Sequence, residues 1–225
     1  VIVLVVIGLV MVFSSSGVYA MEKYNDPYYF LRRQIIWAGL GTLVMFAMRK
    51  MDYRYLEKYT YYIVGITFLM LIAVMVPGLG KEVGGARRWL MFGGFTFQPS
   101  ELAKFALILF IAKSLVKRAD QLKNFAYGYL PKLIVLGFFF VPILFQPDFG
   151  TAMIICAVTF TMLLIAGLRA KFLAYSVLAI IPFIVSAIMS AEYRKRRILA
   201  FLNPWEDPSD TSFQVIQSFY AFGRG

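Results

Sequence analysis

Apolar residues gather along the chain in seven runs that shorter polar and charged stretches separate. A helix needs roughly 20 apolar residues to cross a bilayer, so the second, fourth and fifth runs must include flanking residues to do so. This requirement places Arg33, Glu101 and Lys132 at or within the membrane boundary. The pattern predicts an all-α fold, a polytopic transmembrane helix bundle of about seven spans. The runs cover approximately residues 1–20, 34–48, 60–76, 101–116, 131–146, 150–167 and 172–190.

The same pattern sets the expected domain boundaries. We expect residues 1–190 to form the transmembrane bundle, with a loop at 77–100. Residues 191–225 are more polar and aromatic and form a separate stretch after the bundle.

Composition supports a membrane protein. Hydrophobic residues make up 60% of the 225 residues and the mean hydropathy is +0.72, which is more apolar surface than a soluble domain of this length can bury. The net charge is +11 and the sequence shows no nucleic-acid-binding module, so we expect anionic membrane lipids or an anionic ligand, and no nucleic acid, as partners. A single cysteine, Cys156, and the lack of histidine exclude an intrachain disulfide, a cysteine-based metal site and a histidine-based triad.

Positive charge does not orient the bundle. Apart from Lys104, the 23 Lys and Arg residues divide evenly between the loops on the two sides. One face therefore carries more positive charge than topology signals require. We expect an anion to bind on the face that carries the stretches "ARRW" and "YRKRR".

Glu101 and Lys104 are the charged residues that stand out most, because they fall in the first turns of an apolar run. Residues three apart lie on one helix face and can pair, and charges in a span are costly unless they are paired or face a polar cavity. The pair is therefore either a structural ion pair or the wall of a functional cavity, and in both cases we expect one buried unit. Ser100 is a candidate N-cap for this helix.

Arg87, Arg88 and Trp89 follow two glycines in the same region. Two guanidinium groups beside an indole can clasp a phosphate, and Gly84 and Gly85 would let the loop turn back over the helix start. The alternative is an interfacial tryptophan with solvated arginines.

Two further stretches carry acidic residues. Asp148 in "FQPDFGTA" lies between two apolar runs, where it either caps the next helix or takes part in the function. The stretch "NPWEDPSD" has acids at 206, 207 and 210, which could hold a divalent cation through oxygen ligands or remain solvated in a Pro-rich turn.

Residues 191–225 also predict two helices. Basic residues at 194–197, including Arg196, precede an apolar stretch, as in a short helix that lies in the membrane interface. Apolar positions between 213 and 222 recur at helical spacing and predict a second helix.

Several of these stretches together resemble the SEDS (shape, elongation, division and sporulation) family. The similarity runs through the whole chain in order and is closer to the division and sporulation branch (FtsW and SpoVE) than to the elongation branch (RodA). The stretches that carry it are "MVFSSSGVYA", "YYFLRRQ", "GARRWLMFGGFTFQPSELAK", "FQPDFGTA" and "FLNPWEDPSDTSFQVIQSFYAFGRG".

The resemblance implies a peptidoglycan glycosyltransferase of the bacterial inner (plasma) membrane, with ten spans and both termini in the cytoplasm. It implies that the loop 77–100 and the basic run 194–197 lie at the outer face, and that residues 191–225 begin a large outer-face loop that is cut off before the remaining spans. Such enzymes polymerise lipid II, an undecaprenyl pyrophosphate-linked substrate, together with a class B penicillin-binding protein. The alternatives are a lipid II flippase and a non-catalytic scaffold for that partner. The main catalytic Asp of the family is expected beyond Gly225, so the catalytic residue in this chain is unknown.

The resemblance also assigns roles to the candidate residues. The hydroxyl of an acceptor sugar attacks C1 of the donor and the lipid pyrophosphate leaves, so cations are needed at the leaving group. We expect Arg87, Arg88 and the 194–197 run to supply them. A divalent cation could help to neutralise the pyrophosphate, although the sequence assigns no metal site. Substrate-binding or cavity positions are expected at Arg33, Arg87, Arg88, Trp89, Glu101, Lys104, Asp148 and Arg196.

Overall fold

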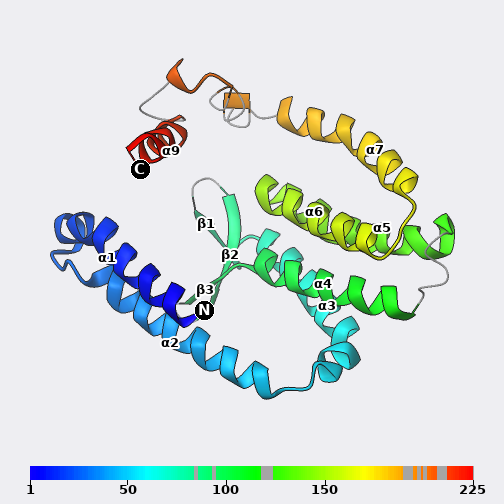
Figure 1. Ribbon diagram of the computed structural model, residues 1–225, viewed down its shortest axis with the longest axis horizontal. Coiled ribbons are helices and arrows are strands. Elements are labelled where there is room, and N and C mark those ends of the chain that lie inside the picture. Colours follow the sequence, from blue (N-terminus) through cyan, green and yellow to red (C-terminus); the bar gives the residue numbers. More distant parts are fainter. Residues whose placement is uncertain are drawn as a thin grey trace. The chain divides into compact units, whose positions relative to one another are not determined.

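The computed structural model consists mainly of helices, with one small antiparallel sheet (Figure 1). The chain divides into two compact units, Val1–Tyr59 and Thr60–Gly225. The structure describes residues 1–83, 86–92, 95–117, 124–189, 195–196, 199, 202–206 and 212–224.

The first unit is a helical hairpin. Helix α1 (Ile2–Tyr24) packs along α2 (Tyr29–Lys50), and α3 (Tyr53–Met75) begins in this unit. Asn25 ends α1 in the left-handed conformation, with φ 54°, and its N–H donates to the Met21 carbonyl. Asn tolerates this conformation better than most residues, so the chain can reverse directly after α1.

The second unit contains the main packed core. Helices α4, α5 and α6 pack against one another, and α3 contributes residues to the same core. Pro99 opens α4, a proline lies in the first turn of α5, and Asp148 caps α6, each a favoured helix-start position. The helices are α4 (Pro99–Lys117), a π-helical turn (Phe125–Tyr129), α5 (Leu130–Phe145), α6 (Phe149–Ile165), α7 (Ala170–Met189), a 3₁₀ turn (Pro204–Glu206) and α9 (Phe213–Arg224).

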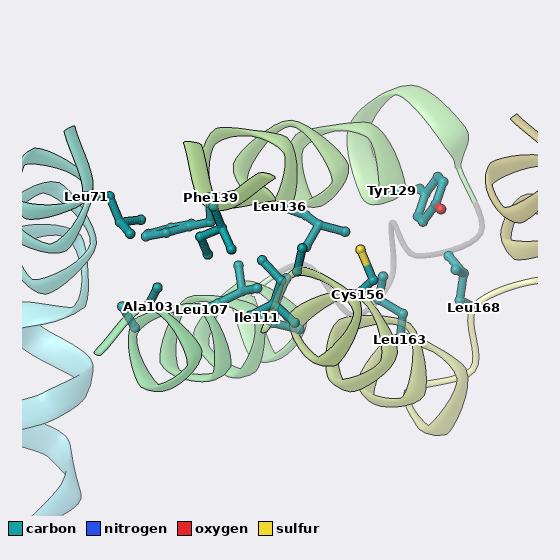
Figure 2. Packing of buried hydrophobic residues seen from close by; sticks show 14 of the residues in the cluster. Leu71, Ala103, Leu107, Ile111, Tyr129, Leu136, Phe139, Cys156, Leu163 and Leu168 are labelled. Atoms are coloured by element: carbon teal, nitrogen blue, oxygen red, sulfur yellow. The ribbon is translucent and has the colours of Figure 1, made fainter. Parts of the chain in front are cut away.

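Figure 2 shows this core, in which large side chains of α3, α4, α5 and α6 meet small ones of α4 and α6. Small residues let helix backbones approach closely, which is a main source of packing energy between helices in lipid. The buried small side chains are those of Ala103, Ala106, Ala152 and Cys156, and the large ones include those of Leu71, Leu107, Phe139 and Leu163.

A three-stranded sheet lies between α3 and α4 in the sequence. Its strands, β1 (Gly80–Val83), β2 (Ala86–Phe92) and β3 (Phe95–Phe97), are antiparallel in the order β1-β2-β3. The register between β1 and β2 shifts, because Lys81 pairs with Trp89 and Glu82 pairs with Arg87. Arg88 is therefore an additional residue on β2, the arrangement of a β-bulge, which commonly re-aims a side chain.

The structure confirms the predicted fold class and places a helix at each of the seven apolar runs. Three described helical segments are long and apolar enough to cross a membrane: Ile2–Tyr24, Tyr53–Met75 and Phe125–Phe145. Two shorter apolar helices follow, Phe149–Ile165 and Ala170–Pro182, and the full count of seven spans stays a prediction. The segment 77–100, expected to be a loop between spans, contains the sheet, and its side of the membrane stays a prediction.

Flanking residues extend the short runs as expected. Arg33, Glu101 and Lys132 all lie inside helices, within the first turns of α2, α4 and α5. Lys132 is fully buried, and its Nζ donates to the carbonyl of Gly128 over 2.5 Å. Near it, the buried Tyr129 hydroxyl lies 2.6 Å from Ser176 Oγ of α7 and joins the start of α5 to that helix.

In the C-terminal stretch, the helix predicted over positions 213–222 is confirmed as α9, which buries Ile216. The predicted interfacial helix around 194–202 lies largely outside the described residues. Its position relative to the membrane therefore stays a prediction.

Gly80 provides a test of how the sheet joins the bundle. A Cβ at Gly80 would overlap the backbone carbonyl of Val74 at the end of α3. We predict that Gly80→Ala lowers the free energy of unfolding by about 1–3 kcal/mol, because backbone atoms would have to move. Gly65→Ala in α3 is the control, since its Cβ would meet no atom within 4 Å and alanine favours a helix. Equal unfolding midpoints for the two variants would contradict the described contact between α3 and β1.

Candidate functional site

The candidate site is a polar network where β2, the start of α4 and the turn between α5 and α6 meet. Arg88 reaches this turn from the bulge on β2. Its Nε donates to the Gln146 carbonyl over 3.0 Å, and its Nη2 donates to the carbonyl of Pro147. The guanidinium therefore satisfies two carbonyls at the end of α5 and ties the sheet to the helical core.

Gln146 links the same turn to α3. It is 2% exposed, and its side-chain Nε2 donates to the Leu71 carbonyl over 2.9 Å. Its Oε1 has no hydrogen-bond partner within the part of the chain that the structure describes. Gln146 thus uses its donor side to hold α3 against the turn, and leaves one buried acceptor open.

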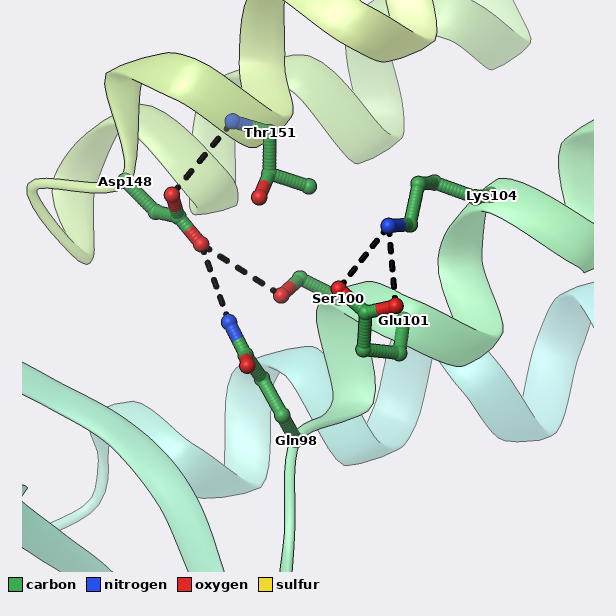
Figure 3. A network of polar contacts seen from close by, with 6 residues as sticks. All are labelled: Gln98, Ser100, Glu101, Lys104, Asp148 and Thr151. Atoms are coloured by element: carbon green, nitrogen blue, oxygen red, sulfur yellow. Dashed lines mark hydrogen bonds and ion pairs between the residues drawn. The ribbon is translucent and has the colours of Figure 1, made fainter. Parts of the chain in front are cut away.

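Asp148 is the centre of the network (Figure 3). It caps α6, with Oδ1 accepting from the Thr151 N–H over 3.4 Å. Its Oδ2 accepts from Gln98 Nε2 over 3.1 Å and lies 3.5 Å from Ser100 Oγ, both on the segment that starts α4. The residue is only 8% exposed, so these donors replace water around the carboxylate.

The structure shows the helix cap expected for Asp148, and a part in the function stays a prediction. Its hydrogen bonds make Asp148 an organising residue that joins α4 to α6.

Glu101 and Lys104 form the expected pair, one turn along α4. Lys104 Nζ lies 2.8 Å from both carboxylate oxygens of Glu101. The expectation that the pair is buried is wrong for the described chain, because the Glu101 side chain is 56% exposed and that of Lys104 is 29% exposed. The two residues lie on the side of α4 that faces away from the helical core. Ala103 and Ala106 are buried on the opposite side, which packs against the core.

Arg87, Arg88 and Trp89 do not act as one group. Arg87 pairs with Glu82 across the sheet, at 3.3 Å, and both side chains are exposed. Arg88 binds the α5–α6 turn instead, and Trp89 is half-buried opposite Lys81 of β1. The bulge directs the two arginines to different surroundings, so they do not form the single phosphate-binding group that the sequence predicted. The tight turn expected at Gly84 and Gly85 lies outside the described residues.

Two other candidate residues are not part of this network. Arg33 belongs to the first unit, where its Nη1 donates to the Tyr29 hydroxyl over 3.4 Å. Arg196 is exposed in a short helical stretch whose neighbours at 194 and 197 fall outside the described residues. No group of three or more carboxylate, cysteine or histidine side chains that could hold a metal ion occurs in the described ranges, which omit positions 207 and 210.

Gln98, Gln146 and Thr151 are site residues that the sequence reasoning missed, and Ser100 has a different role from the one expected. Helix α4 begins at Pro99, so Ser100 lies inside the helix and is directed to Asp148. The available signal was an unusual placement of polar residues, since Gln98 and Gln146 each stand beside a proline at a helix end. Their partners are about 50 to 75 positions away in the sequence, which no local pattern reveals.

Known proteins match the chain over its full length. The family model of cell cycle proteins for FtsW, RodA and SpoVE matches residues 1–225. The probable peptidoglycan glycosyltransferase FtsW of Geobacter metallireducens is 44% identical over 218 residues, which are 97% of this chain and 58% of that protein. Stage V sporulation protein E of Bacillus subtilis is 38% identical over 222 residues, 99% of this chain and 61% of that protein. The chain thus spans about three fifths of the length of these curated relatives.

Solved structures show the same similarity. A chain of a peptidoglycan synthase complex, solved to describe the coordination of polymerization and crosslinking, matches with a TM-score of 0.71 and 30% identity. The match covers 95% of this chain and 62% of that chain. The rod shape determining protein RodA of Thermus thermophilus matches with a TM-score of 0.58 and 27% identity, covering 80% of this chain and 58% of that chain.

The bonds to Asp148 predict a graded response to mutation. Asp148→Ala removes the cap and leaves Gln98 without its acceptor, so we expect the free energy of unfolding to fall by about 2–4 kcal/mol. Ser100→Ala removes only a long bond and should cost about 1 kcal/mol or less. Thermal unfolding of the purified variants measures both effects. A loss for Ser100→Ala as large as that for Asp148→Ala would mean that the carboxylate does not organise this junction.

The exposed pair on α4 predicts weak coupling. In a double-mutant cycle of Glu101→Gln and Lys104→Gln, we expect a coupling free energy below about 1 kcal/mol, because solvent screens the pair. Unfolding midpoints of the wild type, the two single variants and the double variant provide the value. Coupling of several kcal/mol would show that the pair is shielded from water in the membrane.

Proposed function

Because the chain belongs to the FtsW, RodA and SpoVE family of cell cycle proteins, we propose that this multi-pass membrane protein is a peptidoglycan glycosyltransferase that polymerises lipid II. The observation that carries the proposal is the 44% identity, over 97% of the chain, to a relative named as a probable peptidoglycan glycosyltransferase. Similarity to FtsW and to stage V sporulation protein E supports the division and sporulation branch.

The two arginines of β2 take different roles in this proposal. Lipid II carries a pyrophosphate that is charged in the bound substrate as well as in the transition state, so a cation beside it strengthens substrate binding. Arg87 suits this role, because its guanidinium is exposed and its bond to Glu82 is a surface ion pair that a phosphate can replace at small cost. Trp89, two positions further along β2, offers an aromatic face for the lipid or the sugar.

Arg88 is a positioning residue in the same scheme. Its donors at Nε and Nη2 are directed to backbone carbonyls of the α5–α6 turn, which fixes β2 relative to the helices. Asp148 fixes α4 to α6 at the other side of that turn. A rigid support of this kind maintains the geometry on which transfer depends.

We extend the proposal to the setting of the reaction. The protein lies in the bacterial inner membrane with its N-terminus in the cytoplasm, and the sheet β1–β3 faces outward, where lipid II is polymerised. A class B penicillin-binding protein is its partner. The similarity to a chain of a solved complex that coordinates polymerization and crosslinking supports this assignment.

Purified protein and labelled lipid II test the activity directly. A glycosyltransferase converts lipid II to glycan chains that a muramidase digests, without any added polymerase. A flippase moves labelled lipid II across a liposome bilayer and makes no polymer, and a scaffold does neither. Transport without polymer, or no turnover in the presence of the penicillin-binding partner, would contradict the proposal.

Substitutions on β2 distinguish the two arginine roles. We expect Arg87→Ala to raise KM for lipid II by about tenfold or more with kcat largely kept, because it removes a charge-assisted contact with the substrate. Arg88→Ala should instead lower kcat by roughly 10- to 100-fold, because the sheet is no longer held in place. Arg88→Lys keeps the positive charge but loses the planar guanidinium that donates to two carbonyls at once. This variant should therefore resemble Arg88→Ala. Identical kinetic effects at the two positions would contradict this division of roles.

A further inference from the structure

The turn of the α1–α2 hairpin carries a cluster of aromatic rings and cations that the proposed function does not use. Tyr24 and Tyr29 stack with ring centroids 4.1 Å apart and an interplanar angle of 10°. Tyr19 stacks on Phe30 at 6.1 Å, so rings from both helices hold the turn together. Tyr19 and Tyr24 are nevertheless exposed.

Two cations lie on these rings. Lys23 Nζ is 5.3 Å from the centroid of Tyr19 and donates to its hydroxyl over 2.9 Å. The Lys23 amino group is also 5.9 Å from the centroid of Tyr24, and the guanidinium carbon of Arg33 is 5.9 Å from the centroid of Tyr29. The rings restrict both cations in position without neutralising their charge.

Arg32 provides the contrast. Its Nη1 lies 3.3 Å from Asp26 Oδ2, whereas Lys23 and Arg33 form no ion pair with a carboxylate in the described hairpin. The hairpin turn therefore presents two exposed cations that the rings hold in place and that form no ion pair within the described hairpin. Lys23 lies in the last turn of α1, where the helix dipole stabilises a positive charge. Arg33 lies in the first turns of α2, where the dipole does not stabilise a cation, so helix stability does not explain its presence.

We propose that Tyr19, Lys23, Tyr24, Tyr29 and Arg33, the hairpin-turn cluster, bind the phosphate group of an anionic phospholipid. Residues 19–24 end the candidate span Ile2–Tyr24, which places the cluster at the depth of lipid headgroups. Tyrosine rings suit that depth, and the two cations complement a phosphate there. Phospholipid headgroups fill the membrane surface at that depth, so we commit to a membrane phospholipid rather than to a lipid-linked pyrophosphate. The site is independent of the proposed activity.

Native mass spectrometry of the protein, released from nanodiscs of phosphatidylcholine with added phosphatidylglycerol, tests the site. We expect the wild type to retain phosphatidylglycerol selectively. The double variant Lys23→Gln/Arg33→Gln should lose about 30-fold in apparent affinity, since each cation near an anionic surface contributes roughly fivefold. Arg32→Gln is the matched control, because it removes a neighbouring charge that Asp26 already compensates, and it should change the affinity by no more than about threefold.

Three outcomes would overturn the proposal. The first is an equal loss in Arg32→Gln and in the double variant, which would indicate only a general effect of charge. The second is unselective retention of the two phospholipids by the wild type. The third is displacement of phosphatidylglycerol by much lower concentrations of undecaprenyl pyrophosphate, which would make the lipid-linked pyrophosphate the ligand. Because these readouts are lipid binding and not polymer formation, they are separate from the test of the enzyme.

Discussion

A carboxylate can be buried at the end of a membrane helix only if hydrogen-bond donors replace the water that it loses, and Asp148 meets this constraint with donors from two helices. One oxygen caps α6 and the other faces Gln98 and Ser100 at the start of α4. The need to satisfy one charge therefore fixes the relative position of two helix starts. Arg88 adds the sheet to this junction through the carbonyls that precede Asp148.

This arrangement gives the two neighbouring arginines different roles in the proposed polymerisation. The bulge on β2 directs Arg88 to the α5–α6 turn, while Arg87 stays exposed beside Glu82. In the proposed reaction, the first holds the sheet and the second meets the pyrophosphate. The small exposed ion pair on α4, Glu101 with Lys104, adds polarity next to this junction without adding net charge.

The helices could be predicted from the sequence, because lipid requires long apolar segments with internally satisfied backbones. The Glu101–Lys104 pair could also be predicted from the sequence, since residues three apart share a helix face. The sheet could not, because the glycine-rich segment 77–100 has little strict alternation of apolar and polar residues. The partners of Arg88 and Asp148 could not be predicted either, since Gln98 and Gln146 are far away in sequence and become neighbours only when α3, α4 and α6 pack.

Hydrogen–deuterium exchange of the protein and of its Arg88→Gln variant is the most direct test of the claim that this polar junction holds the sheet on the bundle. Loss of the two charge-assisted bonds should accelerate exchange of the β2 amides, residues 86–92, by roughly 10-fold or more. Exchange within α4, whose tie to α6 passes through Asp148, should change much less. Unchanged exchange in β2, or equal acceleration in β2 and α4, would contradict the claim.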